Sequence, residues 1–344
     1  MNDFRTLLAA QSLSWTAIAL ISALAFLLAL WATPVARAAA IRFGIVDNPD
    51  GRLKQQREPV AYLGGLAVFL AVLVSLLLVY SFDLALLGLL MAGSLMVMLG
   101  LIDDLGVLSP RVKFLGQLLA VWVLIKAGVM VQVASVPLWV NALATAFWLV
   151  AVMNAINIID IMDGLATAVA AVASLALVVV ALLNELPVIA AASAALFGAL
   201  AGFYLFNRAP ARIYLGDAGS LFVGLMLGGL TMVVRYADTN DLAVLSPLLI
   251  LAVPLFDTAF VSAVRMYRGQ SPFLGSPDHF ALRLKKQGWP VPRIVLAAAG
   301  AGLLGGVLAL INTGLGWQES LYLYLVTGAL ALGVAAYLAR IRMP

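Results

Sequence analysis

The sequence predicts an all-α polytopic membrane protein of about eleven transmembrane helices, on two observations. Hydrophobic residues make up 64% of the 344 residues, charged residues only 10%, and the mean hydropathy is +1.09, which excludes a water-soluble globular protein. The apolar residues also gather into runs near the ~20 residues that a membrane span needs. We expect one transmembrane domain over residues 1–344, with spans at 14–35, 61–81, 84–102, 113–131, 138–153, 165–184, 187–206, 219–235, 243–262, 294–312 and 320–339.

The basic residues predict how these helices are oriented. All but three of the 20 lysines and arginines fall on one side of the eleven-span arrangement, and the exceptions are Arg5, Lys126 and Arg235. Cytoplasmic loops are enriched in basic residues, so that side is predicted to be cytoplasmic, with the N-terminus outside and the C-terminus inside. The net charge of +4 is then mostly a topology signal and gives no reason to expect a nucleic-acid partner.

The first span is followed by a basic segment, residues 44–65, with a turn at Pro49 and Gly51. It is either a solvated loop beside anionic lipid or a flap over a phosphorylated ligand.

Two adjacent carboxylates, Asp103 and Asp104, end the third span. Adjacent residues diverge by about 100° on a helix, so we do not expect the pair to chelate one ion symmetrically. Two unpaired charges at a negative helix end would be costly, and we expect one to hold a cation and the other a basic partner. Arg111 and Lys113 begin the next span, either as such partners or as positive-inside anchors.

The fifth span ends in a polar repeat, with Asn154, Asn157, Asp160 and Asp163 at every third position. A step of three drifts by about −60° on a regular helix, so the four converge only if the helix tightens or breaks, as Gly164 permits. The structural alternative is a polar helix end in the headgroup layer. Ionisable groups near membrane spans are functional by default, which favours a site.

The segment 206–220 contains Asp217 at the start of the eighth span, where it is either an N-cap or part of a phosphate-binding helix terminus. Asn207 and Tyr214 in the same segment could offer an amide and a stacking face to a base. Further on, Asp257 lies about a turn from the cytoplasmic end of the ninth span. The only histidine, His279, lies in the loop 263–293 and is either functional or ordinary.

The carboxylates of separate spans therefore meet at one membrane depth with basic residues nearby. The chain has no cysteine and one histidine, so a metal here must have oxygen ligands, which points to Mg²⁺ or Mn²⁺. This pattern suits a divalent cation on a diphosphate and predicts phosphoryl transfer between a soluble and a lipid-borne reactant. The main alternative is an ion-coupled membrane transporter. Transporters place such residues near the midplane in repeated halves, and no repeat is visible here.

Several long motifs between about Val46 and Gly288 also occur in the expected order: VDNP, LGG, GLIDDLG with RVKFLGQ, NAINIIDIMDGLA, FNRAPARIYLGDAGS, and PLFDTAF with RGQSPFLGSPDH. In these motifs the chain resembles the polyprenyl-phosphate N-acetylhexosamine-1-phosphate transferases, glycosyltransferase family 4, of the undecaprenyl-phosphate GlcNAc-1-phosphate transferase-like branch. The resemblance implies ten or eleven helices in the bacterial inner membrane. It also implies Mg²⁺-dependent transfer (Mn²⁺ is an alternative) of a sugar 1-phosphate from a UDP-sugar to undecaprenyl phosphate, releasing UMP, to start a lipid-linked cell-envelope glycan.

The expected partners are thus a UDP-sugar, undecaprenyl phosphate and membrane lipid; a homodimer stays open. The resemblance implies that Asp103 and Asp104 activate the lipid phosphate. Roles near the metal and the diphosphate fall on Asn157, Asp160 and Asp217, and roles near the uridine on Asp163, Asn207 and Tyr214. Lys113 matches a position suited to the lipid phosphate. The predicted catalytic residues are Asp103, Asp104 and Asp160; the metal ligands are Asp217 and Asp160; the substrate-binding residues are Asn154, Asn157, Asp163, Asn207, Tyr214, Lys113 and His279.

The chain departs from the family pattern in three places. An HxHH run common in the family corresponds here to His279, Phe280, Ala281 and Leu282, so two histidines are absent. Ile161 replaces a common glycine, and the usual histidine of the 50–57 loop is missing. A catalytically inactive scaffold homologue is therefore a further alternative.

Overall fold

The structure is a computed structural model that describes residues 14–47, 59–79, 84–106, 108–131, 136–234, 236, 240–271 and 276–343. Half of the predicted basic segment 44–65, namely residues 48–58 with the 50–57 loop, lies outside the described residues. The helices are α2 (Trp15–Phe43), α3 (Gly64–Val79), α4 (Leu84–Asp104), α5 (Pro110–Lys126), α6 (Leu138–Ile159), α7 (Leu165–Leu183), α8 (Pro187–Asn207), α9 (Gly216–Val233), η1 (Asp241–Leu245), α10 (Ser246–Ile250), α11 (Ala252–Tyr267), α12 (Phe280–Lys286), α13 (Val291–Asn312) and α14 (Trp317–Ala339).

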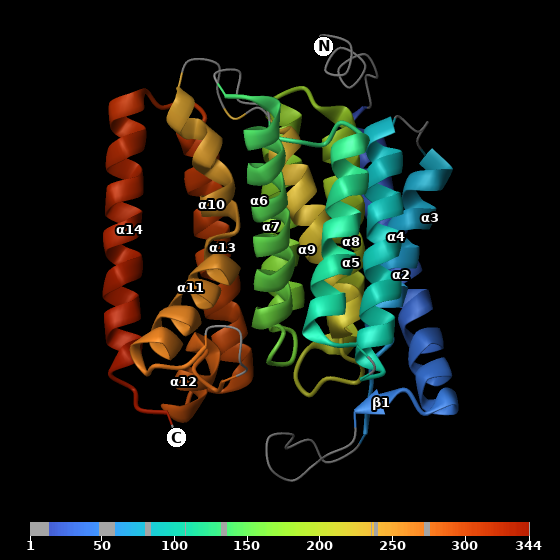
Figure 1. Ribbon diagram of the computed structural model, residues 1–344. Helices are drawn as coiled ribbons and strands as arrows, with labels where there is room; N and C mark the ends of the chain where they lie inside the picture. The colour runs from blue at the N-terminus through green and yellow to red at the C-terminus, as the bar shows by residue number, and fades with distance from the viewer. Residues whose placement is uncertain are drawn as a thin grey trace.

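The long helices run side by side as one bundle, which confirms the all-α membrane class (Figure 1). Among the described residues, eight helices are long and apolar enough to cross a membrane, and a bent pair raises the number to nine. The other two predicted spans contain the shorter helices α3 and α5, with 16 and 17 residues. The number eleven therefore stays a prediction.

One predicted span is a bent pair of helices. The run 243–262 is not a straight helix, because the segment bends by 79° between Asp241–Ile250 and Ala252–Tyr267. At the bend, Leu251 has a φ of −102° and a ψ of 22°, away from helical values. Since α11 continues to Tyr267, Asp257 lies near the middle of that helix and not a turn from its end.

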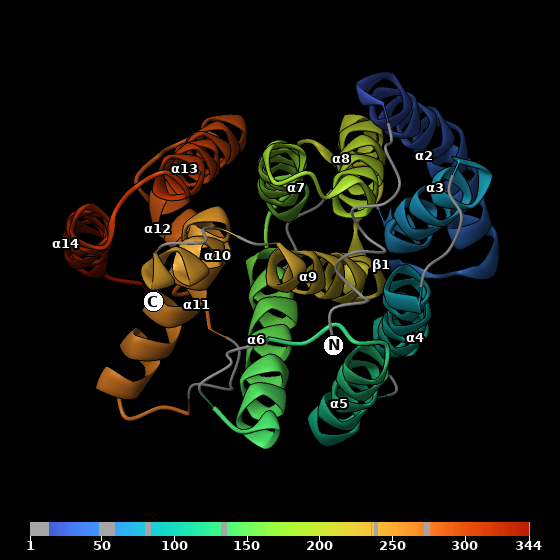
Figure 2. The same ribbon diagram turned by 90° about the horizontal axis from the view of Figure 1, so that it is seen from above.

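Helix α9 lies at the centre of the bundle and contacts α3, α4, α6, α7 and α8 (Figure 2). Its first turn fits against two glycines of neighbouring helices. A Cβ atom on Gly65 of α3 would lie 2.1 Å from the Gly219 nitrogen, and one on Gly100 of α4 would lie 2.3 Å from the Ala218 backbone. Only glycine permits this approach, which holds the start of α9 against the ends of α3 and α4.

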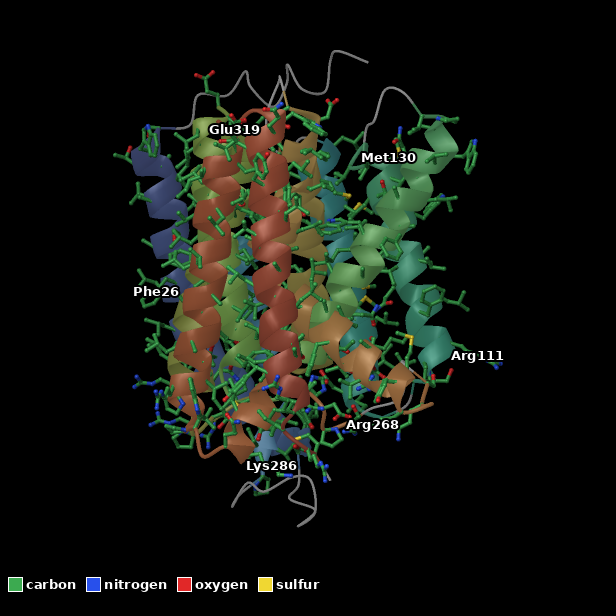
Figure 3. All side chains as sticks on the ribbon, turned by 90° about the vertical axis from the view of Figure 1, so that its left-hand side faces the viewer. Phe26, Arg111, Met130, Arg268, Lys286 and Glu319 are labelled. Carbon is green, nitrogen blue, oxygen red and sulfur yellow. The ribbon has the colours of Figure 1, made fainter. Side chains whose placement is uncertain are left out.

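The two ends of the bundle differ in charge. Arg111, Arg268 and Lys286 lie at one end, and Met130 and Glu319 lie at the other (Figure 3). We call the first the site end. This partition follows the two sides predicted from the sequence, whereas the orientation in a membrane stays a prediction.

The break predicted after the fifth run is confirmed. Helix α6 ends at Ile159, Asp160 follows with φ −78° and ψ 51°, and Gly164 adopts a φ of 75° before α7 begins. Nearby, the short strands β1 (Val46–Asp47) and β2 (Val60–Ala61) pair antiparallel, and Ala61 forms a parallel bridge with Ile213. These pairings bring the start of α3 beside the segment that leads into α9.

Candidate active site

A cavity of about 450 Å³ opens at the site end, where these segments meet. Of the residues predicted to form a site, all but Lys113, Asn154 and His279 line it. The lining is mostly acidic and polar, and consists of Asp47, Tyr62, Asp103, Asp104, Gly106, Asn157, Asp160, Ile161, Met162, Asp163, Asn207, Tyr214, Gly216 and Asp217.

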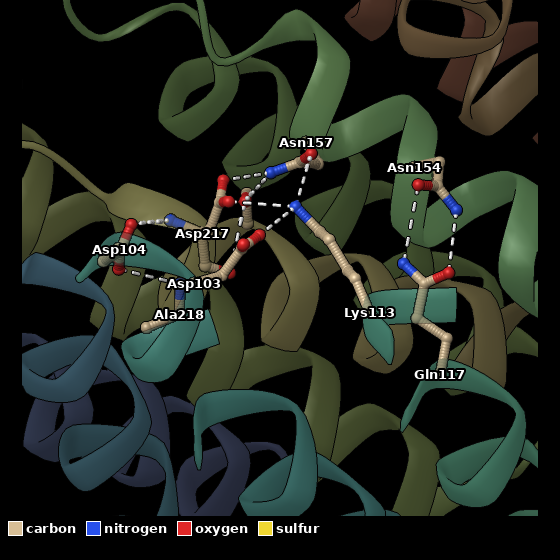
Figure 4. Close-up of polar contacts among 9 residues, drawn as sticks. Asp103, Asp104, Lys113, Gln117, Asn154, Asn157, Asp217 and Ala218 are labelled. Carbon is tan, nitrogen blue, oxygen red and sulfur yellow. Dashed lines mark hydrogen bonds and ion pairs between the residues drawn. The ribbon is translucent and has the colours of Figure 1, made fainter. Parts of the chain in front are cut away.

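Lys113 lies beside the cavity and joins three helices (Figure 4). Its Nζ is 2.7 Å from Asp103 Oδ2 and 2.9 Å from Asp217 Oδ2, and it donates to Asn157 Oδ1 at 3.3 Å. Asn157 Nδ2 in turn donates to Asp217 Oδ1 at 2.5 Å and to Ser220 Oγ at 2.9 Å. The basic partner expected for one of the paired aspartates is therefore Lys113, and the aspartate is Asp103.

Asp104, the other aspartate of the pair, contacts backbone N–H groups where a cation was expected. Its Oδ1 and Oδ2 accept hydrogen bonds from the backbone N–H groups of Asp217 and Ala218, at 2.8 and 3.2 Å. Free N–H groups and a positive partial charge mark a helix N-terminus, so this carboxylate caps α9 from outside. Of the two roles considered for Asp217, that of the N-cap is wrong, because Leu215 holds that position without a side-chain bond. Asp104 also occupies two of the amides that could have bound a phosphate.

Asp160 differs from Asp103, Asp104, Asp163 and Asp217 in its lack of a side-chain partner among the described residues. Within the described part of the chain, its carboxylate has no hydrogen bond or ion pair, although it is partly buried. Burial, and then the negative charges of Asp217, Asp104 and Asp163, raise the pKa of Asp160 to about 8. Once it is ionised, a carboxylate in such surroundings needs a cation or a donor that the described residues do not supply.

The far side of the cavity is built around the 206–215 segment. Asn207 is only 2% exposed, and both ends of its amide are used: Nδ2 donates to the Ile213 carbonyl at 3.0 Å, and Oδ1 accepts from Thr167 Oγ1 at 2.7 Å. Asp163 Oδ2 accepts from the backbone N–H of Ala211 at 2.9 Å. Asn207 and Asp163 therefore hold the 206–215 segment in place through these hydrogen bonds. The roles near the uridine that the resemblance implies for them stay predictions.

Two aromatic rings complete that side. Tyr214 and Tyr62 lie with ring centroids 5.8 Å apart. Burial and the nearby acids raise the pKa of Tyr214 to about 12 and also raise that of Tyr62, so both phenols keep their protons at neutral pH. Neither Tyr62 nor Asp47 was predicted as a site residue from the sequence. The available signal was their place within or next to the VDNP and LGG motifs.

Asn154 and His279 lie away from the cavity lining. Asn154 forms a double amide pair with Gln117 of α5, at 3.1 and 3.5 Å, one turn away from Asn157 (Figure 4). His279 is 5% exposed, and its Nδ1 is 2.7 Å from Asp257 Oδ2. Beside it, the buried Arg283 binds Asp278 at 2.6 Å. The substrate-binding roles of Asn154 and His279 stay predictions.

The residues present fit an oxygen-ligated divalent cation. No preformed group of three or more His, Cys, Asp or Glu residues is found among the described residues. Mg²⁺, however, commonly takes only one or two protein carboxylates and completes its shell with water and substrate phosphates. Asp160 and Asp217 line the same cavity and are the acids suited to this role.

The fold and this cavity define a multi-pass membrane protein with an acidic site at one end of its bundle. The model of glycosyl transferase family 4 matches residues 86–235. The chain is 30% identical over 289 residues to a probable undecaprenyl-phosphate N-acetylglucosaminyl 1-phosphate transferase of Bacillus subtilis, covering 81% of this chain and 80% of the relative. It therefore belongs to the polyprenyl-phosphate N-acetylhexosamine-1-phosphate transferases, glycosyl transferase family 4.

Two further relatives match this chain over most of its length. A decaprenyl-phosphate N-acetylglucosaminephosphotransferase of Mycolicibacterium smegmatis is 31% identical and covers 81% of this chain and 78% of its own length. A phospho-N-acetylmuramoyl-pentapeptide-transferase of Listeria welshimeri is 27% identical, with 78% and 89% covered. The family match includes α4 to α9, the helices that carry most of the cavity.

Proposed function

We propose that this protein transfers an N-acetylhexosamine 1-phosphate from a UDP-sugar to undecaprenyl phosphate at the cytoplasmic face of a bacterial inner membrane, releasing UMP. The product would start a lipid-linked cell-envelope glycan. Family membership supports the reaction class. The observation that carries the proposal is a cavity in which acids from separate helices surround Asp160, with Lys113 beside it. Asp160 itself has no partner among the described residues.

The chemistry is one displacement at phosphorus. An oxygen of the lipid phosphate attacks the β-phosphorus of the UDP-sugar, the new P–O bond forms, and the bond between that phosphorus and the bridging oxygen breaks, so that UMP leaves. The second pKa of a phosphomonoester is near ~6, so the nucleophile is already mostly ionised at neutral pH. The protein therefore needs no strong general base.

The side chains divide the remaining work. Asp160 and Asp217 would hold the divalent cation, which when bound neutralises charge on the diphosphate. Lys113, held by Asp103, lies where it can orient the lipid phosphate. Asp104 fixes the first turn of α9 and thereby the position of Asp217. Tyr62 and Tyr214 offer apolar ring surface at the side of the cavity suited to a base.

The test is a turnover assay with the purified full-length protein. It is incubated with undecaprenyl phosphate, Mg²⁺ and a panel of UDP-sugars, and both UMP and the lipid product are measured. We expect product with at least one UDP-N-acetylhexosamine, and a loss of about 100-fold or more in Asp217→Asn and in Asp160→Asn, because each removes a charged ligand. Asp241→Asn, which changes an acid of η1 outside the cavity, is the matched control and should keep activity.

Other outcomes distinguish the alternatives. Full activity in Asp217→Asn would remove that residue from the mechanism. No product with any UDP-sugar would contradict the proposed reaction and favour the inactive scaffold homologue. Solute uptake into proteoliposomes without nucleotide turnover would favour the transporter, a class that uses broken helices such as the bent segment 241–267.

A further inference from the structure

The Lys113 ammonium occupies a position that would also suit a divalent metal ion. Its three contacts are oxygens of three residues on three helices: Asp103 on α4, Asn157 on α6 and Asp217 on α9. Two of the three are carboxylates within 3 Å. Oxygen atoms gathered in this way are the ligand type that hard divalent cations prefer.

The two acids proposed to hold the metal therefore differ in whether their carboxylate oxygens already have partners. Both oxygens of Asp217 have partners, since Oδ2 contacts Lys113 and Oδ1 accepts from Asn157. The carboxylate of Asp160 has no partner in the described part of the chain. A cation can bind the open Asp160 directly, but it can reach the Oδ2 of Asp217 only where Lys113 gives way.

We infer that Lys113 is a resident cation that competes with the divalent metal for Asp217 and, once displaced, becomes free to bind the phosphate of the lipid acceptor. The inference rests on the proposed function, because it takes Asp217 as a metal ligand. It implies an order: metal with the donor first, then the acceptor phosphate.

The properties of lysine suit this exchange. A divalent cation at Asp217 would repel an ammonium about 3 Å away, which drives the lysine off that carboxylate. The ammonium ends a flexible four-carbon stem and is a compact point charge with rotatable donors, so it can change partners at low cost. Asp103, at 2.7 Å, keeps the displaced group at the edge of the cavity. An arginine would hold the carboxylates in a fixed two-pronged geometry and resist displacement.

The test measures metal binding without turnover. The full-length protein in detergent is titrated with Mn²⁺ as the probe, and free Mn²⁺ is measured by its paramagnetic resonance signal. We expect Lys113→Gln to bind Mn²⁺ at least about tenfold more tightly than wild type, because a competing charge is removed. Lys113→Arg should bind no more tightly than wild type. Lys126→Gln, at the other end of the same helix, is the matched control and should match wild type.

A second arm follows the released lysine. Binding of dodecyl phosphate, a lipid phosphate without a nucleotide, is measured with and without Mg²⁺. In wild type, Mg²⁺ should tighten this binding several-fold. In Lys113→Gln most of that gain should disappear, although the variant binds metal better.

Equal or weaker Mn²⁺ binding by Lys113→Gln would overturn the inference. If that variant aggregates in detergent, Lys113→Arg carries the test, and tighter Mn²⁺ binding than wild type would overturn the inference. The metal titration needs no UDP-sugar, so its failure is distinguishable from that of the proposed function, which would appear as absence of UMP release by the wild-type protein.

Discussion

At the scale of single residues, the acidic side chains of the cavity lower the stability of the folded protein but suit the binding of a charged ligand. Asp160 lies partly buried among Asp104, Asp163 and Asp217 and has no partner among the residues that the structure describes, an arrangement that costs folding free energy when the carboxylate is ionised. Sites that bind a charged ligand commonly keep such unfavourable charges, because the ligand compensates them.

The pKa of Asp160 leads to a test of stability against pH. Its folded-state pKa of about 8 lies above the unfolded value of 3.8, so the folded protein binds the extra proton between about pH 4 and pH 8. Stability is therefore lost as the pH rises through this window. In metal-free buffer at pH 8, Asp160→Asn should unfold a few degrees higher than wild type, and at pH 4 the two should nearly coincide. Thermal unfolding in detergent measures this, and an equal difference at both pH values would contradict it.

At the scale of elements, the register of α5 against α6 is decided by few contacts. Much of α5 is exposed, and it meets α6 next to the cavity through Lys113–Asn157 and Gln117–Asn154. The two pairs are about one turn apart on both helices. Amide pairs between membrane helices contribute about 0.6 kcal/mol on average and up to ~1.7 kcal/mol. We therefore interpret the Gln117–Asn154 pair as a contact that keeps α5 in register with α6 and so supports the position of Lys113.

This interpretation predicts a rescue. Gln117→Leu and Asn154→Leu should each lower kcat by about tenfold, the equivalent of ~1.4 kcal/mol, and leave KM for the UDP-sugar unchanged, because Asn154 does not line the cavity. The exchange variant Gln117→Asn with Asn154→Gln restores two amides and should recover much of the loss. A raised KM in Asn154→Leu would instead support the original expectation that Asn154 binds substrate.

At the scale of the whole molecule, the bundle is organised around α9, and α14 is the least buried of its candidate spans. In α14, only 6% of the span is buried in the protein, and polar contacts hold both of its ends. Arg283 donates to the carbonyls of Leu338 and Ile341 at the site end, and Asn240 donates to Ser320 at the other. The cavity, by contrast, is lined by the start of α9, the span with the highest buried share, 83%.

Packing around α9 predicts which glycines matter. Gly100→Ala would place a methyl group 2.3 Å from the Ala218 backbone, so it should displace the first turn of α9 and lower both the unfolding temperature and transfer activity. Gly333→Ala on α14 has no atom within 4 Å of its new methyl group and should leave both unchanged. Thermal unfolding and UMP release check the pair, and equal tolerance of the two changes would contradict the packing argument.

The sequence by itself determined the membrane class and the helix break before Gly164, and its motifs marked most of the residues that line the cavity. The class and the break follow from composition and local spacing, which a helix converts directly into position. An oxygen-ligated metal stays a prediction. Tertiary structure alone decided the partners. Lys113 meets Asp217, Asp104 caps α9, Asn154 pairs with Gln117, and the 241–267 segment bends. Apolar periodicity leaves open which neighbour each helix face meets, and these polar contacts form only once the helices pack in one register.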